Sequence, residues 1–85
     1  MLTKVTKDHI GQGMRKSSSL CPISLSLLDE TGITYYVGVC GIFEADGELL
    51  MDLTAEMRQF IGRFDDGEFV EPFSFERPEP KNAKD

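Results

Sequence analysis

The sequence of 85 residues is poor in cysteine, in histidine and in long apolar runs. Small secreted proteins that rely on disulfides usually carry about four cysteines or more, so the two cysteines favour a reduced, cytoplasmic chain. Two cysteines and one histidine also do not complete a tetrahedral zinc site. The longest apolar stretch, residues 35–43, is far shorter than the roughly 20 residues that span a bilayer. Because the N-terminus has no apolar run of signal-peptide length either, neither membrane insertion nor export is expected.

Basic residues are also few: nine Lys and Arg against fifteen Asp and Glu give a net charge of −6. This balance disfavours direct binding to nucleic acid, whose backbone is negative. The first 20 residues are an exception, because they hold Lys4, Lys7, Arg15 and Lys16 against Asp8. A chain of this length makes one small domain with a marginal core, so self-association into a homo-oligomer is expected to complete it.

Local patterns predict a single α+β domain over residues 1–75. Residues 2–6 are typical of a strand, residues 8–13 of a turn, and residues 14–19 of a mobile loop. Ser19 or Cys21 is expected to cap a helix that has Pro22 in its first turn and ends at Gly32.

The second half of the domain continues with strands. Residues 34–43 predict a strand, followed by a hairpin turn at Asp46-Gly47 and a return strand over residues 48–52. Thr54 is expected to cap an amphipathic helix that ends at Gly67. A last strand over residues 69–75 contains Pro72, which favours a sheet edge, and residues 76–85 are expected to be a disordered tail. The order strand-helix-strand-strand-helix-strand is that of the ferredoxin-like, split βαββαβ arrangement.

Two segments resemble a group of small proteins found in bacteriophages and bacteria. Residues 21–27 read CPISLSL, similar to C-P-I-A-L-A-L in that group. Residues 60–75 read FIGRFDDGEFVEPFSF, similar to its pattern F-I-x-x-F-D-x-G-x-x-V-x-P-F-x-F. His9, Ile10 and Gly13 extend the likeness toward the N-terminus, and serines stand where the group often has alanines. The resemblance implies a viral or mobile-element setting and no catalytic residues.

The most suggestive binding feature is the loop of residues 11–19 that runs into a predicted helix. Free backbone N–H groups, serine hydroxyls and two cations together favour a bound anion, such as a phosphate. The candidate ligand-binding residues are His9, Arg15, Lys16, Ser17, Ser18 and Ser19, with Tyr35 and Tyr36 available to stack on a ring. One of the two tyrosines is expected to face outward. Since the loop matches neither phosphate-binding glycine motif, a flexible loop with a serine cap is the alternative.

These features support a leading hypothesis of a non-enzymatic phage accessory protein without a cofactor. It would act in the cytoplasm as a homo-oligomer and counter host defence by sequestering a nucleotide-like signalling molecule. An alternative is an acidic inhibitor that imitates nucleic acid and docks on a basic host protein through Asp65, Asp66, Glu68 and Glu71. A structural or virion-associated protein is a further alternative.

An enzyme would have to use Cys21 as nucleophile with His9 as base. The competing interpretation is that Cys21 and Cys40 are both buried, inert core residues, because free cysteine is among the most buried residue types.

Overall fold

The computed structural model describes residues 1–79, which form three helices and five strands. In chain order these are β1 (Leu2–Val5), α1 (Lys7–Gln12), α2 (Pro22–Thr31), β2 (Tyr35–Val37), β3 (Gly41–Glu44), β4 (Leu49–Asp52), α3 (Ala55–Asp65) and β5 (Phe73–Glu76). The predicted α+β class is confirmed. The order of the elements agrees roughly with the predicted one, with α1 and one strand added.

The strands form two separate antiparallel sheets. β1 pairs with β5, and β2, β3 and β4 make a second sheet in that order. The ferredoxin-like arrangement would instead join the first and last strands to the central pair in one sheet. One physical reason lies at the edge of β2, where the Val37 N–H donates to the Ser18 carbonyl at 2.8 Å. The loop before α2 thus occupies part of the edge that a further strand would need.

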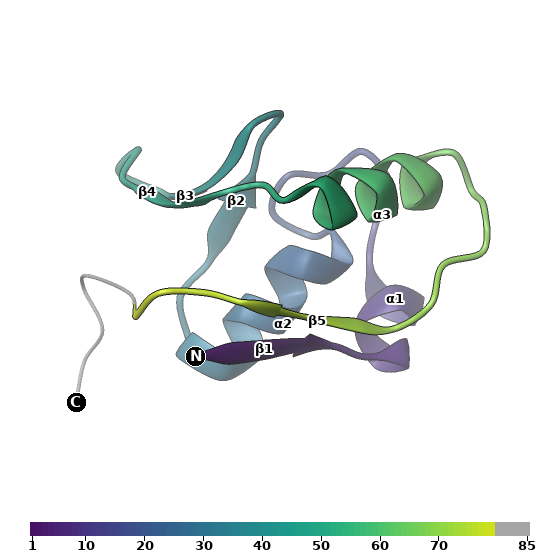
Figure 1. Cartoon of the computed structure of the whole chain (residues 1–85), viewed down its shortest axis with the longest axis horizontal. Helices are drawn as coiled ribbons and strands as arrows, with labels where there is room; N and C mark the ends of the chain where they lie inside the picture. Colours follow the sequence, from purple (N-terminus) through teal and green to yellow (C-terminus); the bar gives the residue numbers. More distant parts are fainter. Residues whose placement is uncertain (80–85) are drawn as a thin grey trace.

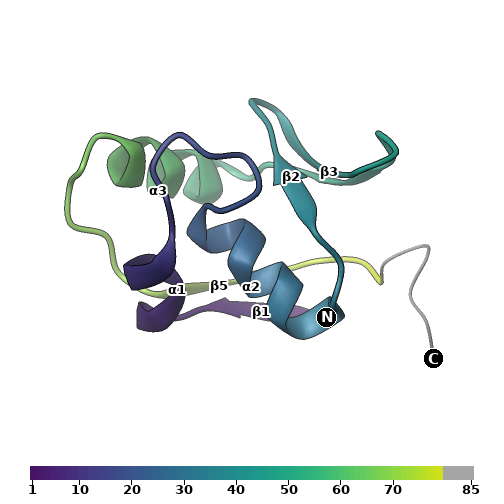
Figure 2. The ribbon, with the colours of Figure 1, turned by 180° about the vertical axis from the view of Figure 1, so that it is seen from behind.

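Helix α2 connects the two sheets. It packs against β1 on one side and β2 on the other, with α1 beside it. In Figure 1, α2 lies behind β1 and β5 while α3 lies above them, and Figure 2 shows α2 in front when the molecule is seen from behind. The core between these elements is built from Val5, Cys21, Ile23, Leu27, Tyr35, Val37, Ile42, Leu53, Met57, Phe60 and Phe75.

The capping predictions for the two longer helices are confirmed. Cys21 is the N-cap of α2, where its Sγ accepts the Ser24 N–H at 3.4 Å, and Gly32 ends the helix in the left-handed conformation with φ of 74°. Thr54 caps α3 by accepting the Met57 N–H at 3.1 Å. Helix α3 ends at Asp65, two residues before Gly67.

The prediction of a turn over residues 8–13 was wrong, since most of these residues belong to α1. Thr6 caps this helix by accepting the His9 N–H, and His9 Nδ1 accepts the Thr6 N–H at 3.0 Å. This reciprocal pair is a capping box in which histidine stands where Glu or Gln is usual. The sequence pattern for such a box was therefore not recognisable.

The predicted strand over residues 34–43 is two strands. Gly38 donates its N–H to the Gly41 carbonyl at 2.8 Å, so the chain reverses between β2 and β3. Cys40 lies in this turn and is exposed, so the prediction that it is a core residue was wrong. The hairpin turn at Asp46-Gly47 is confirmed between β3 and β4.

The C-terminal predictions are partly wrong. The last strand begins at Phe73, so Pro72 precedes it rather than lying within it. Glu76 belongs to β5, and the Arg77 side chain is buried and hydrogen-bonded, so neither belongs to a disordered tail. Residues 80–85 of that predicted tail lie outside the described residues.

Candidate functional site

His9 has a structural position at the start of α1. Its Nδ1 is engaged by Thr6, and its Nε2 lies 2.6 Å from Asp29 Oδ2. Because Nδ1 accepts the Thr6 N–H, the proton of the neutral ring lies on Nε2 and is donated to Asp29. Both ring nitrogens are thus occupied by the chain itself. A ligand would have to displace one of these partners to reach the imidazole.

The predicted anion-binding loop divides between two places. Lys16, Ser17 and Ser18 line a shallow hollow of about 290 Å³ beside Cys21 and Asp65, whereas Arg15 faces a different hollow. Lys16 adopts a positive φ of 59°, and its N–H donates to Asp65 Oδ1 at 2.8 Å. Since a carboxylate already takes this N–H, an anion at the same place would be repelled.

The three serines of this loop make hydrogen bonds within the fold, Ser17 through its hydroxyl and Ser18 and Ser19 through their carbonyls. Ser17 Oγ accepts the Leu20 N–H at 3.1 Å. The Ser18 carbonyl binds Val37, and the Ser19 carbonyl accepts a hydrogen bond from Ser24 Oγ at 2.9 Å. These bonds attach the loop to α2 and β2. Ser17 and Ser18 line the hollow beside Cys21, whereas Ser19 is not among its lining residues.

The two tyrosines of β2 point to opposite faces of the sheet, as alternation along a strand requires. Tyr35 is fully buried, while Tyr36 is 39% exposed, so the prediction that one tyrosine faces outward is confirmed. Neither tyrosine lines the hollow that contains Arg15. The residues proposed to stack on a ring and to bind its phosphate are therefore not brought together.

Cys21 has a poor environment for a nucleophile. Its Sγ is the N-cap acceptor of α2, and burial raises the pKa of the thiol, an effect that its backbone hydrogen bonds only partly offset. A raised pKa lowers the fraction of thiolate, which is the reactive form. Cys21 therefore acts in this structure as a capping and packing residue.

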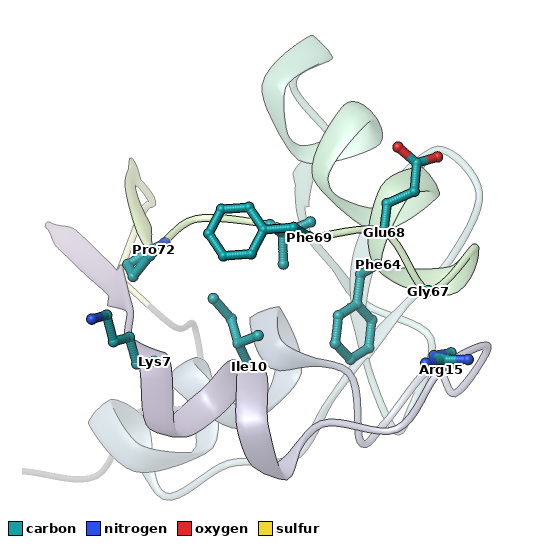
Figure 3. A pocket seen from close by; sticks show the side chains of 9 residues that line it. Lys7, Ile10, Arg15, Phe64, Gly67, Glu68, Phe69 and Pro72 are labelled. Carbon is teal, nitrogen blue, oxygen red and sulfur yellow. The ribbon is translucent and has the colours of Figure 1, made fainter.

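The arrangement with the best chemistry for a ligand is a hollow that we name the Phe69 hollow, with a volume of about 270 Å³. It lies between α1, the C-terminal end of α3 and the segment that leads to β5, and is lined by Lys7, Ile10, Arg15, Phe64, Gly67, Glu68, Phe69, Val70 and Pro72. Figure 3 shows the Phe69 ring between Pro72 and Phe64, with Ile10 facing it from α1. The centre of the hollow is therefore apolar.

Two cations stand at opposite ends of the Phe69 hollow. Lys7 begins α1 and lies at the end near Pro72, whereas Arg15 lies at the end near Phe64 and Gly67 (Figure 3). Within residues 1–79 no ion pair or hydrogen bond engages either charged group. Glu68, the acid that also lines the hollow, points away from Ile10 (Figure 3). Both cations are thus available to a ligand.

Gly67 lets Arg15 approach the end of α3. Gly67 has a positive φ of 80°, and a Cβ built on it would lie 3.1 Å from Arg15 Cζ. A side chain at position 67 would therefore strain the backbone and push the guanidinium away. The glycine that follows Asp65 and Asp66 thus allows Arg15 to lie against the hollow.

Phe69 is the most conspicuous residue of the site, because 81% of it is exposed. Within residues 1–79, no hydrogen bond holds the backbone of residues 69–72. β1 stops pairing at Val5, opposite Phe73, where the chain turns into α1. Among the described residues, no strand therefore lies beside residues 69–72. An exposed aromatic ring on an unpaired segment can move onto a ligand at small cost.

Sequence reasoning found Arg15 but missed Lys7 and Phe69. Phe69 was assigned to a strand that does not reach it, and Lys7 was noted only as one of the cations of the first 20 residues. One signal could have found Phe69: it stands between Glu68 and Glu71, close to Asp66, and a ring flanked by acids does not fit a core strand.

Comparison with protein-family models, with curated proteins and with solved structures gives no match for this chain. Among residues 1–79, no three His, Cys, Asp or Glu side chains are grouped in a way that could hold a metal ion. Within the same residues, no helix has the length and apolar character that crossing a membrane requires. The geometry of the Phe69 hollow therefore provides the basis for a functional interpretation.

Proposed function

We propose that this protein binds and sequesters a small, ring-bearing anion of nucleotide type in the Phe69 hollow. The observation that carries the proposal is that Lys7 and Arg15, which make no ion pair within residues 1–79, stand at the two ends of a hollow that holds the exposed ring of Phe69. The proposal keeps the ligand class expected from the sequence and moves its site from residues 15–19 to α1 and the segment after α3.

The chemistry of the hollow fits the parts of such a ligand. A flat base or other ring can lie between Phe69 and Ile10, where it gains apolar and stacking contacts. Arg15 can hold phosphate or carboxylate oxygens in a fork, and Lys7 adds a point charge. The volume of about 270 Å³ lies near the lower limit of drug-sized pockets, roughly 300 Å³, which favours one ring system over two.

The environments of Cys21 and His9, the two candidate catalytic residues, support binding without turnover. The Cys21 thiol is buried with a raised pKa, and both nitrogens of His9 are engaged by the chain. The resemblance to small phage proteins supports a setting in the cytoplasm of an infected bacterium. There, removal of a nucleotide-like signal would counter a host defence, and a homo-oligomer would multiply the sites.

Calorimetric titration with adenosine monophosphate and with inorganic phosphate tests the proposal. We expect the nucleotide to bind more tightly than phosphate, because the ring contributes contacts with Phe69. Arg15→Ala should weaken nucleotide binding by about tenfold or more, since a charge-assisted hydrogen bond is lost. Phe69→Ala should reduce the difference between nucleotide and phosphate.

Lys16→Ala is the matched control, because Lys16 adjoins Arg15 in sequence but lines the other hollow. We expect it to leave nucleotide binding within about twofold of the wild type. Equal effects of Arg15→Ala and Lys16→Ala would indicate general charge attraction and would refute the assignment of the hollow. Native mass spectrometry after exposure to an extract of infected bacteria would then identify the ligand by its added mass.

A second candidate is the acidic protein inhibitor, which the exposed acids Asp66, Glu68 and Glu71 around Phe69 favour. An aromatic ring inside a polar rim is typical of a protein interface, and an acidic rim would suit a basic partner. A host protein retained by the chain, with binding that falls steeply as salt increases, would support this function. Retention that is unchanged by Glu71→Lys would contradict it.

A further inference from the structure

A second hollow, which we name the α3 hollow, adjoins the Phe69 hollow. It has a volume of about 490 Å³ and lies between α3 and the segment that leads into β5. Phe69, Val70 and Pro72 line both hollows, so the two meet along this segment. The lining residues that belong to the α3 hollow alone are Glu56, Gln59, Phe60, Arg63, Glu71 and Phe73.

Aromatic rings form the apolar part of the α3 hollow. The ring centroids of Phe60 and Phe73 lie 4.7 Å apart, with an angle of 45° between the two ring planes. Phe60 is buried and Phe73 is only partly buried, while Phe69 beside them is exposed. These three rings offer apolar surface on which a flat ring of a ligand can pack.

Polar side chains of α3 form a rim beside these rings. Glu56, Gln59 and Arg63 follow one another at intervals of three and four residues, which places them on one face of the helix. All three are exposed, and within residues 1–79 no ion pair or hydrogen bond engages the charged group of Arg63. The guanidinium donates hydrogen bonds, the carboxylate accepts them and the amide does both. Such a rim beside aromatic surface fits a heterocyclic base, whose edge also carries donors and acceptors.

The two hollows differ in the sign of their charge. Two cations and one acid line the Phe69 hollow, whereas one cation and two acids line the α3 hollow. The net charge is therefore +1 in the first hollow and −1 in the second. A phosphate is attracted to the Phe69 hollow and repelled by the α3 hollow, while an uncharged ring can occupy either.

We propose that the ligand is of dinucleoside type, with two ring systems joined through phosphate. One ring and the phosphate occupy the Phe69 hollow, and the second ring occupies the α3 hollow. This inference rests on the proposed binding of a nucleotide-type anion in the Phe69 hollow, and it specifies the class of that ligand.

The size and the mobility of the site agree with two rings. The volume of about 490 Å³ exceeds the lower limit of roughly 300 Å³ for a ligand pocket, so the α3 hollow has room for a ring system of its own. Phe69 lines both hollows and can contact a ring in each. Within residues 1–79 no hydrogen bond holds the backbone of residues 69–72, so this segment can adjust to a ligand that lies across it.

Calorimetric titration with two phosphodiesters tests the proposal. One is ApA, in which a phosphodiester joins two adenosines, and the other is adenosine methyl phosphate, in which a methyl group replaces one adenosine. Both carry one negative charge and differ only in the second nucleoside. We expect ApA to bind at least about tenfold more tightly, because its second ring adds contacts with Phe69 and Phe73. Arg63→Ala should weaken ApA binding by about tenfold and leave binding of the methyl phosphate within about twofold of the wild type.

Arg58→Ala is the matched control, because Arg58 is also exposed on α3 but lines neither hollow. It removes the same charge, and we expect it to leave the affinity for both phosphodiesters within about twofold of the wild type. Circular dichroism establishes that both variants are folded.

Three results would overturn the two-ring ligand: equal affinities of the wild type for the two phosphodiesters, equal losses of both in Arg63→Ala, or equal losses of ApA binding in Arg63→Ala and Arg58→Ala. Adenosine monophosphate separates such a failure from that of the proposed function. If this nucleotide still binds and Arg15→Ala weakens it, the function of the Phe69 hollow stands and only the second ring is refuted. A protein that binds none of the three ligands would refute both proposals.

Discussion

At the scale of single residues, Tyr35 combines deep burial with an unsatisfied polar group. Its side chain is fully buried in the core, and its hydroxyl has no hydrogen-bond partner within residues 1–79. Burial first, and the nearby Glu44 charge second, raise the pKa of this hydroxyl, which therefore stays neutral. Since none of the described residues bonds to the hydroxyl, they leave its desolvation uncompensated.

Tyr35→Phe removes this hydroxyl and keeps the ring. We expect the free energy of unfolding to rise by about 1 kcal/mol, because no hydrogen bond is lost while an unsatisfied group disappears. Urea unfolding followed by circular dichroism measures the change. Tyr36→Phe is the control, because Tyr36 is partly exposed, and it should change stability by less than about 0.5 kcal/mol. Destabilisation by Tyr35→Phe would mean that the hydroxyl has a bound partner such as water.

The residues of the candidate site show how far single positions can be interpreted from sequence. Arg15 could be predicted because it is a cation in a glycine- and serine-rich loop, which is a local pattern. Lys7 and Phe69 could not, because they are 62 positions apart in sequence (69 − 7) and meet only through the fold. Tyr35 was predicted as a possible ligand contact, yet alternation along β2 placed it in the core.

At the scale of elements, local signals predicted the longer helices well. Pro22 and Gly32 bound α2, and Thr54 caps α3, because a cap depends on a few neighbouring residues. The short helix α1 was missed, since its capping box uses His9. Strand pairing was missed for a different reason. The contact of β1 with β5 joins the two ends of the described chain, and no local pattern encodes such a pairing.

Gly41 tests the packing of β3 against β4. A Cβ at this position would meet Leu49 Cδ1 at 2.7 Å and the backbone carbonyl oxygen of Met51 at 3.1 Å. We expect Gly41→Ala to lower the free energy of unfolding by about 1 to 3 kcal/mol, because the backbone oxygen of a paired strand cannot move freely. Chemical denaturation gives this value directly.

Gly38→Ala is the matched comparison in the same hairpin. A Cβ at Gly38 would meet only the Gly41 carbonyl oxygen, at an ordinary distance of 3.5 Å. Its effect should therefore stay within about 0.5 kcal/mol. Equal effects of the two substitutions would show that β4 does not close over Gly41.

At the scale of the whole molecule, Arg77 fastens the two ends of the described chain to α2. Its Nε donates to Thr3 Oγ1 at 2.6 Å, and its Nη2 donates to Glu30 Oε1 at 3.1 Å. The Thr3 hydroxyl also donates to Glu30 at 3.0 Å. The Met1 ammonium donates to the Arg77 carbonyl at 2.9 Å. The buried guanidinium of Arg77, the residue that directly follows β5, thus connects this end of the chain with β1 and with the C-terminal end of α2.

This cluster makes the stability of the domain depend on pH through Glu30. Burial raises the pKa of the Glu30 carboxyl, but the hydrogen bonds from Arg77 and Thr3 outweigh it, so the pKa lies below its ordinary value of 4.5. A carboxyl whose pKa is lower in the folded state stabilises the fold above its unfolded pKa. This contribution is lost as the pH falls through the folded pKa.

Glu30→Gln keeps the shape of the side chain and removes its charge. At neutral pH we expect the free energy of unfolding of this variant to be about 1 kcal/mol lower than that of the wild type. The reason is that a charge-assisted hydrogen bond becomes a neutral one. As the pH falls below 4.5, the wild type should lose this advantage and the two stabilities should converge. Urea unfolding at a series of pH values measures the gap. Glu71→Gln is the control, because Glu71 is exposed and makes no ion pair within residues 1–79, so it should change stability by less than about 0.5 kcal/mol. A gap for Glu30→Gln that stays constant into acid would show that its charge does not hold Arg77 in place.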